Sequence, residues 1–281
     1  MHLIPENFKK LPKVESPRHI VFCDFDETYF PHKMDELKKI NLKSLETYLY
    51  NHAKKENLMI GWVTGSSLKS VLEKMEKGGL EYLPHFIASG LGTEIAYFDE
   101  NHILFTDKKW EMKLKESNFK VERVEKLVRK IKRDYHITLI LQTQIGNSKY
   151  KVNYYYRKQD IISDARNIDI LRKLANEYQL GLNINQCNPL AGDPEDCYDV
   201  DFIPTGSGKD EIVRFILEKY RQSKDNAFAF GDSGNDLSMI KSVENGYLMQ
   251  NATDEAKNGH DTLAIGEYSL GILNTLKEFI K

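Results

Sequence analysis

The chain has 281 residues, of which 41% are hydrophobic and 29% are charged. This length accommodates one large hydrophobic core with a second, smaller unit, and the hydrophobic share excludes a disordered chain. The 40 basic and 42 acidic residues give a formal net charge of -2. No global positive field would therefore attract nucleic acid or an anionic membrane, and a small diffusing substrate is the expected partner.

The cysteines and the hydrophobic segments of the sequence indicate in which cellular compartment the protein is expected. Cys23, Cys187 and Cys197 are too few and too widely spaced for a disulfide framework, and no pair has the CxxC spacing of a metal or redox site. The N-terminus lacks a basic head with an apolar run, and no segment approaches the ~20 apolar residues of a membrane span. We expect a cytoplasmic protein that is neither exported nor anchored. The sequence carries no signal for its oligomeric state.

Two apolar runs in the first third are typical of buried parallel strands. The run Ile20–Cys23 ends in acidic residues, and the run Leu58–Val63 ends in Thr64-Gly-Ser-Ser67. Between them, residues 34–55 carry apolar side chains at helical spacing, and residues 68–77 form a second predicted helix. The alternation of strand and helix predicts a parallel sheet built from βαβ units.

The last third repeats this pattern, whereas the middle of the chain differs from it. A helix is predicted over 210–221 and a strand over 227–230, followed by Gly231-Asp-Ser-Gly-Asn-Asp236. The middle predicts an α+β insertion with antiparallel strands: helix 121–135, strands 136–145 and 149–157, helix 163–179, strand 180–187, a loop at 188–197 and a strand at 197–203.

The predicted fold is therefore α/β, with one domain split by another. Residues 1–111 and 200–281 form a Rossmann-like core with a parallel sheet, and residues 112–199 form the inserted domain. The first 17 residues or so are expected to be an N-terminal arm.

Polar side chains gather where the predicted strands of the core end. Asp24 and Asp26 are two residues apart at a strand end, so both can face the crevice above the sheet, where open α/β sheets bind ligands. Four carboxylates at this edge would repel one another unless a cation shared the site, and an all-oxygen cluster suits Mg²⁺. The other residues expected at this edge are Thr64, Gly65, Asp232, Asn235 and Asp236.

This set of residues suits the hydrolysis of phosphate esters. One carboxylate can attack phosphorus, and a second can exchange protons with the leaving oxygen and then with water. A metal ion and a lysine can neutralise the charge that develops on the phosphoryl group. Lys209 is the candidate lysine.

Taken together, the four segments resemble the motifs of a known superfamily. Asp24-Phe-Asp-Glu-Thr28, Val63-Thr-Gly-Ser66, Lys209 and Gly231-Asp-Ser-Gly-Asn-Asp236 are similar, in this order, to the four motifs of the haloacid dehalogenase (HAD) superfamily. The resemblance covers nearly the whole chain. It implies an enzyme, because the phosphatases and mutases of the superfamily carry an acidic residue at the position of Asp26.

The resemblance also implies roles for these residues. Asp24 would be the nucleophile that forms an aspartyl-phosphate, and Asp26 would be the general acid and base. Asp24, the Asp26 carbonyl and Asp232 would bind Mg²⁺, with Asp236 supporting the metal from just outside. The residues implied in phosphate binding are Thr64, Gly65, Lys209 and Asn235.

The inserted domain resembles the C2-type cap of the sucrose-phosphate phosphatase and Cof-like branch. Residues 88–94 are also similar to the segment that leads to the cap in that branch. Lys151 and Asn153 share one face of a predicted cap strand and are candidates for contacting the substrate. Glu27 departs from the family pattern, since many relatives carry Gly or Asn at this position. The substrate implied is a small sugar phosphate, with an amino-hexose 6-phosphate as a candidate.

Several alternatives fit parts of the pattern. A DxD pair alone is more often a solvated turn, and a glycosidase would need no Lys209 and no GDSGND segment. The segment Thr205–Asp210 resembles a P-loop, but Ile203 and Asp210 stand where that motif requires Gly and Ser or Thr. A phosphosugar mutase and a catalytically silent HAD-fold binding protein stay open as alternatives to a phosphatase.

Overall fold

The computed structural model describes residues 8–99, 103–143, 148–189 and 192–280. The chain divides into two compact units, one made of Met1–Trp110 with Lys209–Lys281 and the other of Glu111–Gly208. Residues 1–7 of the expected arm, 144–145 of a predicted strand and 190–191 of the predicted loop lie outside the described residues. No described helix is both long enough and apolar enough to cross a membrane.

The boundary predicted at residue 200 falls inside β11 (Cys197–Pro204), which belongs entirely to the second unit. The reason is the pairing of this strand, which continues to its last residue, where Pro204 lies opposite Leu180. The short segment after β11 then leads into the second part of the first unit.

The first unit contains a seven-stranded sheet within the described residues, in the order β13-β12-β2-β3-β5-β6-β7. Its strands are β2 (His19–Cys23), β3 (Leu58–Val63), β5 (Phe86–Ser89), β6 (Glu94–Phe98), β7 (Leu104–Thr106), β12 (Ala227–Gly231) and β13 (Asn245–Leu248). Its helices are α1 (Glu36–Glu56), α2 (Leu68–Gly78), α6 (Lys209–Tyr220), α7 (Leu237–Ile240), α8 (Asp254–Gly259) and α9 (Tyr268–Phe279), and α3 (Lys108–Glu116) crosses into the second unit.

The predicted parallel sheet is confirmed from β13 to β5, but the remaining edge is antiparallel. β5 pairs antiparallel with β6, and β6 pairs antiparallel with β7. The chain reverses between β5 and β6 at Gly90, Leu91 and Gly92, which have φ values of 58°, 61° and 74°. Three consecutive residues in the left-handed region turn the chain back on itself, so no crossover helix is needed here.

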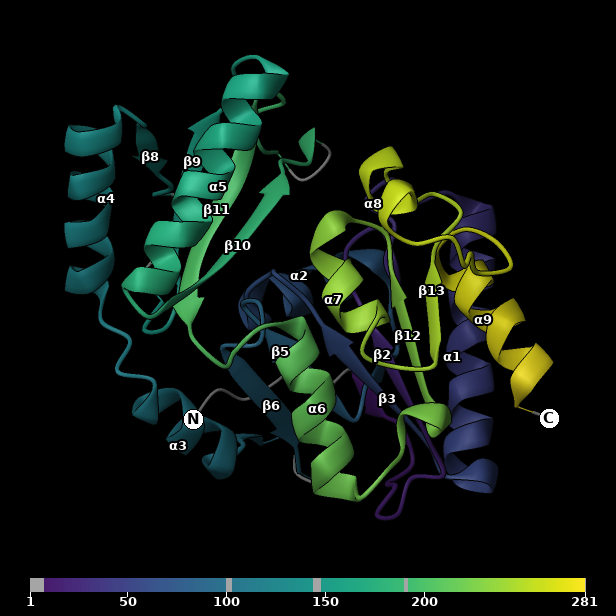
Figure 1. The fold of residues 1–281 in the computed structure, drawn as a ribbon. Coiled ribbons are helices and arrows are strands. Elements are labelled where there is room, and N and C mark those ends of the chain that lie inside the picture. The colour runs from purple at the N-terminus through teal and green to yellow at the C-terminus, as the bar shows by residue number, and fades with distance from the viewer. Residues whose placement is uncertain (1–7, 100–102, 144–147, 190–191, 281) are drawn as a thin grey trace. The chain divides into compact units, whose positions relative to one another are not determined.

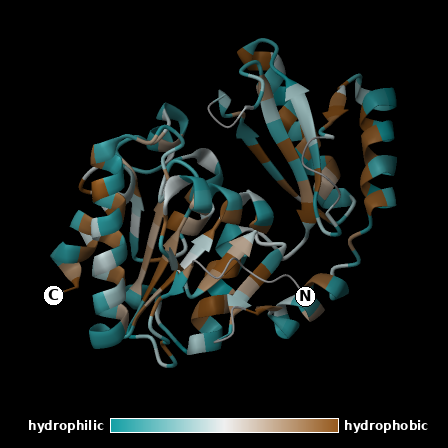
Figure 2. Ribbon diagram, turned by 180° about the vertical axis from the view of Figure 1, so that it is seen from behind, coloured by the Kyte–Doolittle hydropathy of each residue, from teal (hydrophilic) through white to brown (hydrophobic). Residues whose placement is uncertain are grey.

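Helices cover the sheet with apolar side chains, and those of α1 lie at the spacing that predicted this helix. One core cluster joins Leu45 and Leu49 of α1 and Ile272 of α9 to Val21 and Ile60 of the strands. Figure 1 shows α1 and α9 side by side, with the strands between them and α6. Figure 2 shows the hydrophobic residues concentrated on the strands and on the helix sides next to them. This burial is the main term that stabilises the unit.

The described part of the N-terminal arm is packed against this unit. Phe8 and Val14 are buried, and β1 (Lys9–Lys10) pairs in parallel with β4 (Tyr82–Leu83). Residues 8–14 are therefore part of the core's packing.

Gly61 in β3 lies against an aromatic ring. A Cβ atom at this position would lie 2.0 Å from Cζ of Phe86, far inside van der Waals contact. We expect Gly61→Ala to destabilise the fold by about 1–3 kcal/mol, because either the ring or the strand must move. Urea unfolding measures this loss, and Phe86→Leu in the same chain should recover part of it. A Gly61→Ala protein as stable as wild type would contradict the packing described.

In its described residues, the second unit has a four-stranded antiparallel sheet with helices. Its sheet has the order β10-β11-β9-β8, and all three pairs are antiparallel as predicted. Tyr156 and Phe202 on one face pack with α4 and α5 in a hydrophobic cluster, whereas Asn153 and Asp201 lie on the other face. The elements of this unit, besides β11, are α4 (Val121–Tyr135), β8 (Leu139–Leu141), β9 (Val152–Arg157), α5 (Ile161–Glu177) and β10 (Leu180–Gln186).

Candidate active site

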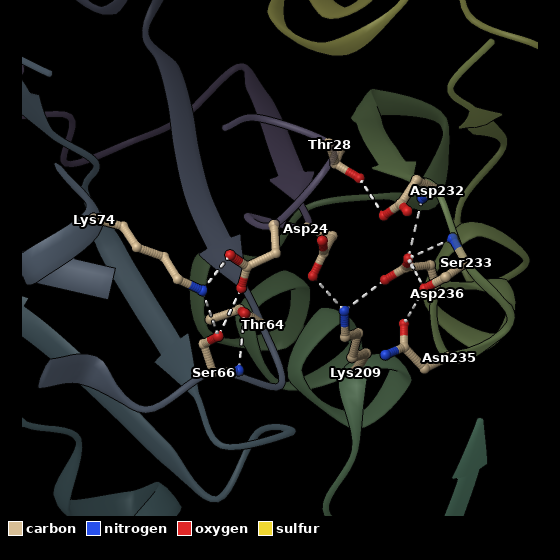
Figure 3. Close-up of polar contacts among 11 residues, drawn as sticks. Asp24, Thr28, Thr64, Ser66, Lys74, Lys209, Asp232, Ser233, Asn235 and Asp236 are labelled. Carbon is tan, nitrogen blue, oxygen red and sulfur yellow. Dashed lines mark hydrogen bonds and ion pairs between the residues drawn. The ribbon is translucent and has the colours of Figure 1, made fainter. Parts of the chain in front are cut away.

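Three candidate residues of the first unit come directly after the ends of adjacent strands. Asp24 comes directly after β2, Thr64 after β3 and Asp232 after β12. β2 pairs in parallel with both β3 and β12, so the carboxyl ends of all three strands meet at one edge. Lys209 is the first residue of α6 and reaches the same place (Figure 3). The structure thus brings together the residues that the sequence predicted here.

Lys209 is the charged centre of this group. Its side chain is 2% exposed, and Nζ lies 2.6 Å from Oδ1 of Asp24 and 2.5 Å from Oδ1 of Asp236. The two carboxylates raise the pKa of Lys209 above its usual value, despite burial, which opposes its charge. Lys209 therefore stays an ammonium, and it can neutralise an anion bound beside Asp24.

Asp236 uses its second oxygen to hold the backbone after β12. Its Oδ2 accepts hydrogen bonds from the backbone N–H groups of Asp232 and Ser233, both at 3.1 Å. Gly231 makes this approach possible, because a Cβ atom there would lie 2.3 Å from Cβ of Asp236. With both oxygens engaged, Asp236 is placed to orient Lys209 and the Asp232 segment.

Asp24, Asp232 and Asp236 form a cluster that suits a cation. Each offers a carboxylate oxygen, and these oxygens lie within 4.8 Å of one another. Burial raises the pKa of Asp24 to about 8, although Lys209 opposes the shift, and burial with the charges of Asp236 and Asp24 also raises the pKa of Asp232. A divalent cation would oppose both shifts, so the donor set and its charge fit a hard cation such as Mg²⁺.

The remaining predicted phosphate-binding residues border this cluster. Thr64 is buried, and its Oγ1 accepts a hydrogen bond of 3.0 Å from the backbone N–H of Ser66. Gly65 lies between them on the same turn after β3. The Asn235 side chain is held by Ser233, whose Oγ donates to Asn235 Oδ1 at 3.0 Å. Figure 3 shows Asn235 on the same side of the group as Lys209.

Asp26 has a separate set of partners. Its Oδ2 accepts a hydrogen bond of 2.6 Å from Ser66 Oγ, while Oδ1 accepts from Lys74 Nζ and lies 2.8 Å from His32 Nε2. Burial opposes the charge of Asp26, but the His32 hydrogen bond and the Lys74 charge outweigh it and lower the pKa of Asp26 well below its usual value. The sequence prediction missed Lys74 and His32, which lie outside the four motifs.

The two candidate substrate residues of the second unit contact a carboxylate of the same sheet. Lys151 Nζ lies 3.7 Å from Oδ1 of Asp201, and Asn153 Nδ2 donates to the same oxygen. Asn183 Nδ2 donates to the other oxygen of Asp201 at 3.1 Å. Gln142 donates from Nε2 to Asp199 Oδ1 at 2.7 Å. One face of this sheet therefore carries a polar network with Asp201 at its centre, a residue that sequence reasoning did not single out.

Comparison with known proteins decides the family. The model of the sucrose-6F-phosphate phosphohydrolase family matches residues 17–280. The chain belongs to this family. It is a HAD-type phosphoric monoester hydrolase, which confirms the predicted superfamily, fold and enzyme class.

A curated protein and a solved structure from Bacillus subtilis are both particularly similar to the chain. Kanosamine-6-phosphate phosphatase of strain 168 is 55% identical over 97% of this chain and 96% of its own length. The crystal structure of yhjK, a haloacid dehalogenase-like hydrolase protein, shares 54% identity and has a TM-score of 0.76, with 98% of this chain and 96% of that one covered.

A more distant structure has the same fold. The sucrose-phosphatase of Synechocystis sp. PCC6803, solved in complex with sucrose and phosphate, has a TM-score of 0.72 at 19% identity, with 94% of this chain and 98% of that one covered. At this identity the match shows the shared fold alone.

Proposed function

We propose that the protein hydrolyses an amino-hexose 6-phosphate, with kanosamine 6-phosphate as the first candidate, in a Mg²⁺-dependent reaction in the cytoplasm. The observation that carries this proposal is the 55% identity to kanosamine-6-phosphate phosphatase over 97% of the chain. The geometry supports it, since Asp24, Lys209 and Asp232 form a buried, charged site at the end of a parallel sheet. A buried, charged site of this type suits a small polar molecule.

The proposed reaction has two steps that the two aspartates share. In the first, a carboxylate oxygen of Asp24 attacks phosphorus and the bond from phosphorus to the sugar oxygen breaks. The pKa of Asp26 is low in the free protein, and the negative charge of the bound phosphate opposes this shift, so that Asp26 enters the step protonated and gives its proton to the sugar oxygen. The products are the free sugar and an aspartyl-phosphate. In the second, Asp26 takes a proton from water as the water oxygen attacks phosphorus. The bond to Asp24 breaks, phosphate leaves, and both aspartates return to their starting forms.

The other residues of the site hold charge in place during these steps. Lys209, already 2.6 Å from Asp24, would neutralise the phosphoryl oxygens, and Thr64, Gly65 and Asn235 would position them. Asp24, Asp232 and the Asp26 carbonyl would hold Mg²⁺, which would supply further positive charge to the phosphoryl group. Asp236 would keep Lys209 and the Asp232 segment aligned for this purpose.

We further propose that the unit Glu111–Gly208 acts as the cap that selects the sugar. Its polar sheet face carries Lys151 and Asn153, which we expect to contact the substrate, and Asp201, a carboxylate that could bind the ammonium group of an amino-hexose. Asp201 is only 5% exposed. Its contacts with Lys151, Asn153 and Asn183 would hold the carboxylate in one orientation.

A substrate panel tests the proposed function. Phosphate release is measured for kanosamine 6-phosphate, glucosamine 6-phosphate, glucose 6-phosphate and sucrose 6F-phosphate, each with Mg²⁺ and with EDTA. We expect the amino-hexose phosphates to have the highest kcat/KM, with a loss of at least about 100-fold in EDTA that added Mg²⁺ restores, because the buried carboxylates need a cation.

Other outcomes of this panel would favour the alternatives. A mutase would convert one sugar phosphate into another with little free phosphate, and a silent binding protein would release none from any ester. Equal activity on glucose 6-phosphate and the amino sugars would contradict the proposed specificity while leaving the phosphatase activity intact.

A further inference from the structure

The acid–base aspartate contacts two residues that lie outside the four motifs, His32 and Lys74. Asp26 and Asp24 are two residues apart, yet each has its own ammonium group, Lys74 for Asp26 and Lys209 for Asp24. Lys74 Nζ also lies 3.4 Å from Ser66 Oγ, the other donor to Asp26. In Figure 3, Lys74 and Ser66 point toward each other on the side of the group away from Asp232. Both oxygens of the Asp26 carboxylate are thus engaged.

The position of Lys74 is fixed by the packing of its helix. Val71 and Met75, on either side of Lys74 in α2, are fully buried in the main core cluster. Ser67 caps the start of the helix by accepting a hydrogen bond of 3.2 Å from the backbone N–H of Ser70. The helix therefore presents the Lys74 ammonium at a defined place, and only the side chain's own rotamers remain free.

His32 is held in turn by Glu27. Its Nε2 lies 2.8 Å from Asp26, and Nδ1, on the other side of the ring, lies 3.2 Å from Oε1 of Glu27. The same glutamate oxygen accepts a hydrogen bond of 2.8 Å from the backbone N–H of His32. The imidazole therefore stands between two carboxylates. Glu27 fixes the backbone of His32 by a hydrogen bond, whereas Nδ1 of the ring lies near Glu27 without forming a hydrogen bond.

Glu27 adopts an unfavourable backbone conformation to do this. Its φ of 59° is in the left-handed region, which glycine and asparagine enter more easily than glutamate. Its backbone oxygen accepts a hydrogen bond of 2.7 Å from Asn251 Nδ2, which holds the turn. A glutamate in such a conformation is explained if its carboxylate is needed at this place.

We propose that His32, Lys74 and Glu27 are positioning residues that hold the Asp26 carboxyl group in the orientation required for proton transfer. Lys74 and His32 act on Asp26 directly, and Glu27 acts through His32. This inference rests on the proposed function, because it assigns to Asp26 the proton transfers of that reaction. It gives Glu27, a departure from the family pattern, a defined task.

Steady-state kinetics on the preferred sugar phosphate test the proposal. We expect His32→Ala and Lys74→Met each to lower kcat by about 10- to 100-fold, with KM within about twofold of wild type, because orientation of the acid–base group is lost while the phosphate-binding residues are untouched. His32→Gln and Lys74→Arg keep a donor and should recover most of the loss. Lys69 lies in the same helix and its side chain is 87% exposed, so Lys69→Met is the control and should have the kcat and KM of wild type.

The variant Glu27→Gly separates positioning from folding. Glycine suits a φ of 59°, so the thermal midpoint should be unchanged or higher, while kcat falls by about 10-fold because His32 loses its support.

A rise in KM at unchanged kcat for His32→Ala and Lys74→Met would overturn the proposal, since it would make these residues substrate ligands. Wild-type kcat in all three variants would overturn it too. Failure of the wild-type protein on every ester would instead refute the proposed function.

Discussion

Replacing Asp24 with asparagine is expected to reduce phosphate release by at least about 10⁴-fold, because the amide cannot form the covalent intermediate. Asp24 is buried at the end of β2, and its Oδ1 lies 2.6 Å from Lys209. Asparagine preserves the shape of this side chain and removes one buried negative charge. We therefore expect the variant to fold, with the loss confined to kcat. Phosphate release from the preferred sugar phosphate, together with a thermal unfolding curve, measures both properties.

Asp169→Asn is a suitable control for this substitution. Asp169 is an exposed residue of α5 that pairs with Lys173, so its replacement should leave the activity unchanged. An Asp24→Asn protein that keeps more than about a tenth of wild-type kcat would exclude Asp24 as the nucleophile.

Lys209→Met is expected to have the largest effect on stability. The substitution leaves Asp24 and Asp236 buried without their shared ammonium, whose Nζ lies 2.6 Å and 2.5 Å from them. Loss of one partner from a buried ion pair costs about 3–5 kcal/mol, so the free energy of unfolding should fall by this amount and phosphate release should fall with it. Urea unfolding with and without Mg²⁺ measures the effect, and Mg²⁺ should recover part of the stability by binding the unpaired carboxylates.

Lys219→Met provides a comparison within the same helix. Lys219 pairs with Asp107 and is 34% exposed, so solvent screens its charge and its loss should cost less than that of Lys209. Equal losses of stability for the two variants would contradict the central position given to Lys209.

The helices and strands that were predicted have apolar side chains at simple periods, whereas β13, α8 and α9 were not predicted. The strand Leu58–Val63 and the helix Val121–Tyr135 have the predicted bounds, since the first is buried along its length and the second has one apolar face. The antiparallel edge formed by β6 and β7 was not predicted. It depends on the left-handed turn at Gly90–Gly92, in which Leu91 has a conformation that its side chain does not favour.

The core of the candidate site was predictable for a related reason. Asp24, Thr64 and Asp232 each follow a buried strand, and parallel strands bring such residues to one edge. His32 and Lys74 were not predictable, because neither lies at a strand end and their meeting at Asp26 depends on how a turn and a helix pack. Whether Lys151 and Asn153 contact the substrate stays a prediction.

Chemical trapping of the intermediate tests the central claim most directly. The enzyme is quenched during turnover of its preferred sugar phosphate and treated with borohydride, which reduces an aspartyl-phosphate to homoserine. Peptide mass spectrometry then locates the reduced residue. Our account predicts homoserine at position 24 in the wild-type protein and none in Asp24→Asn. An unmodified Asp24 together with homoserine at another position would contradict it.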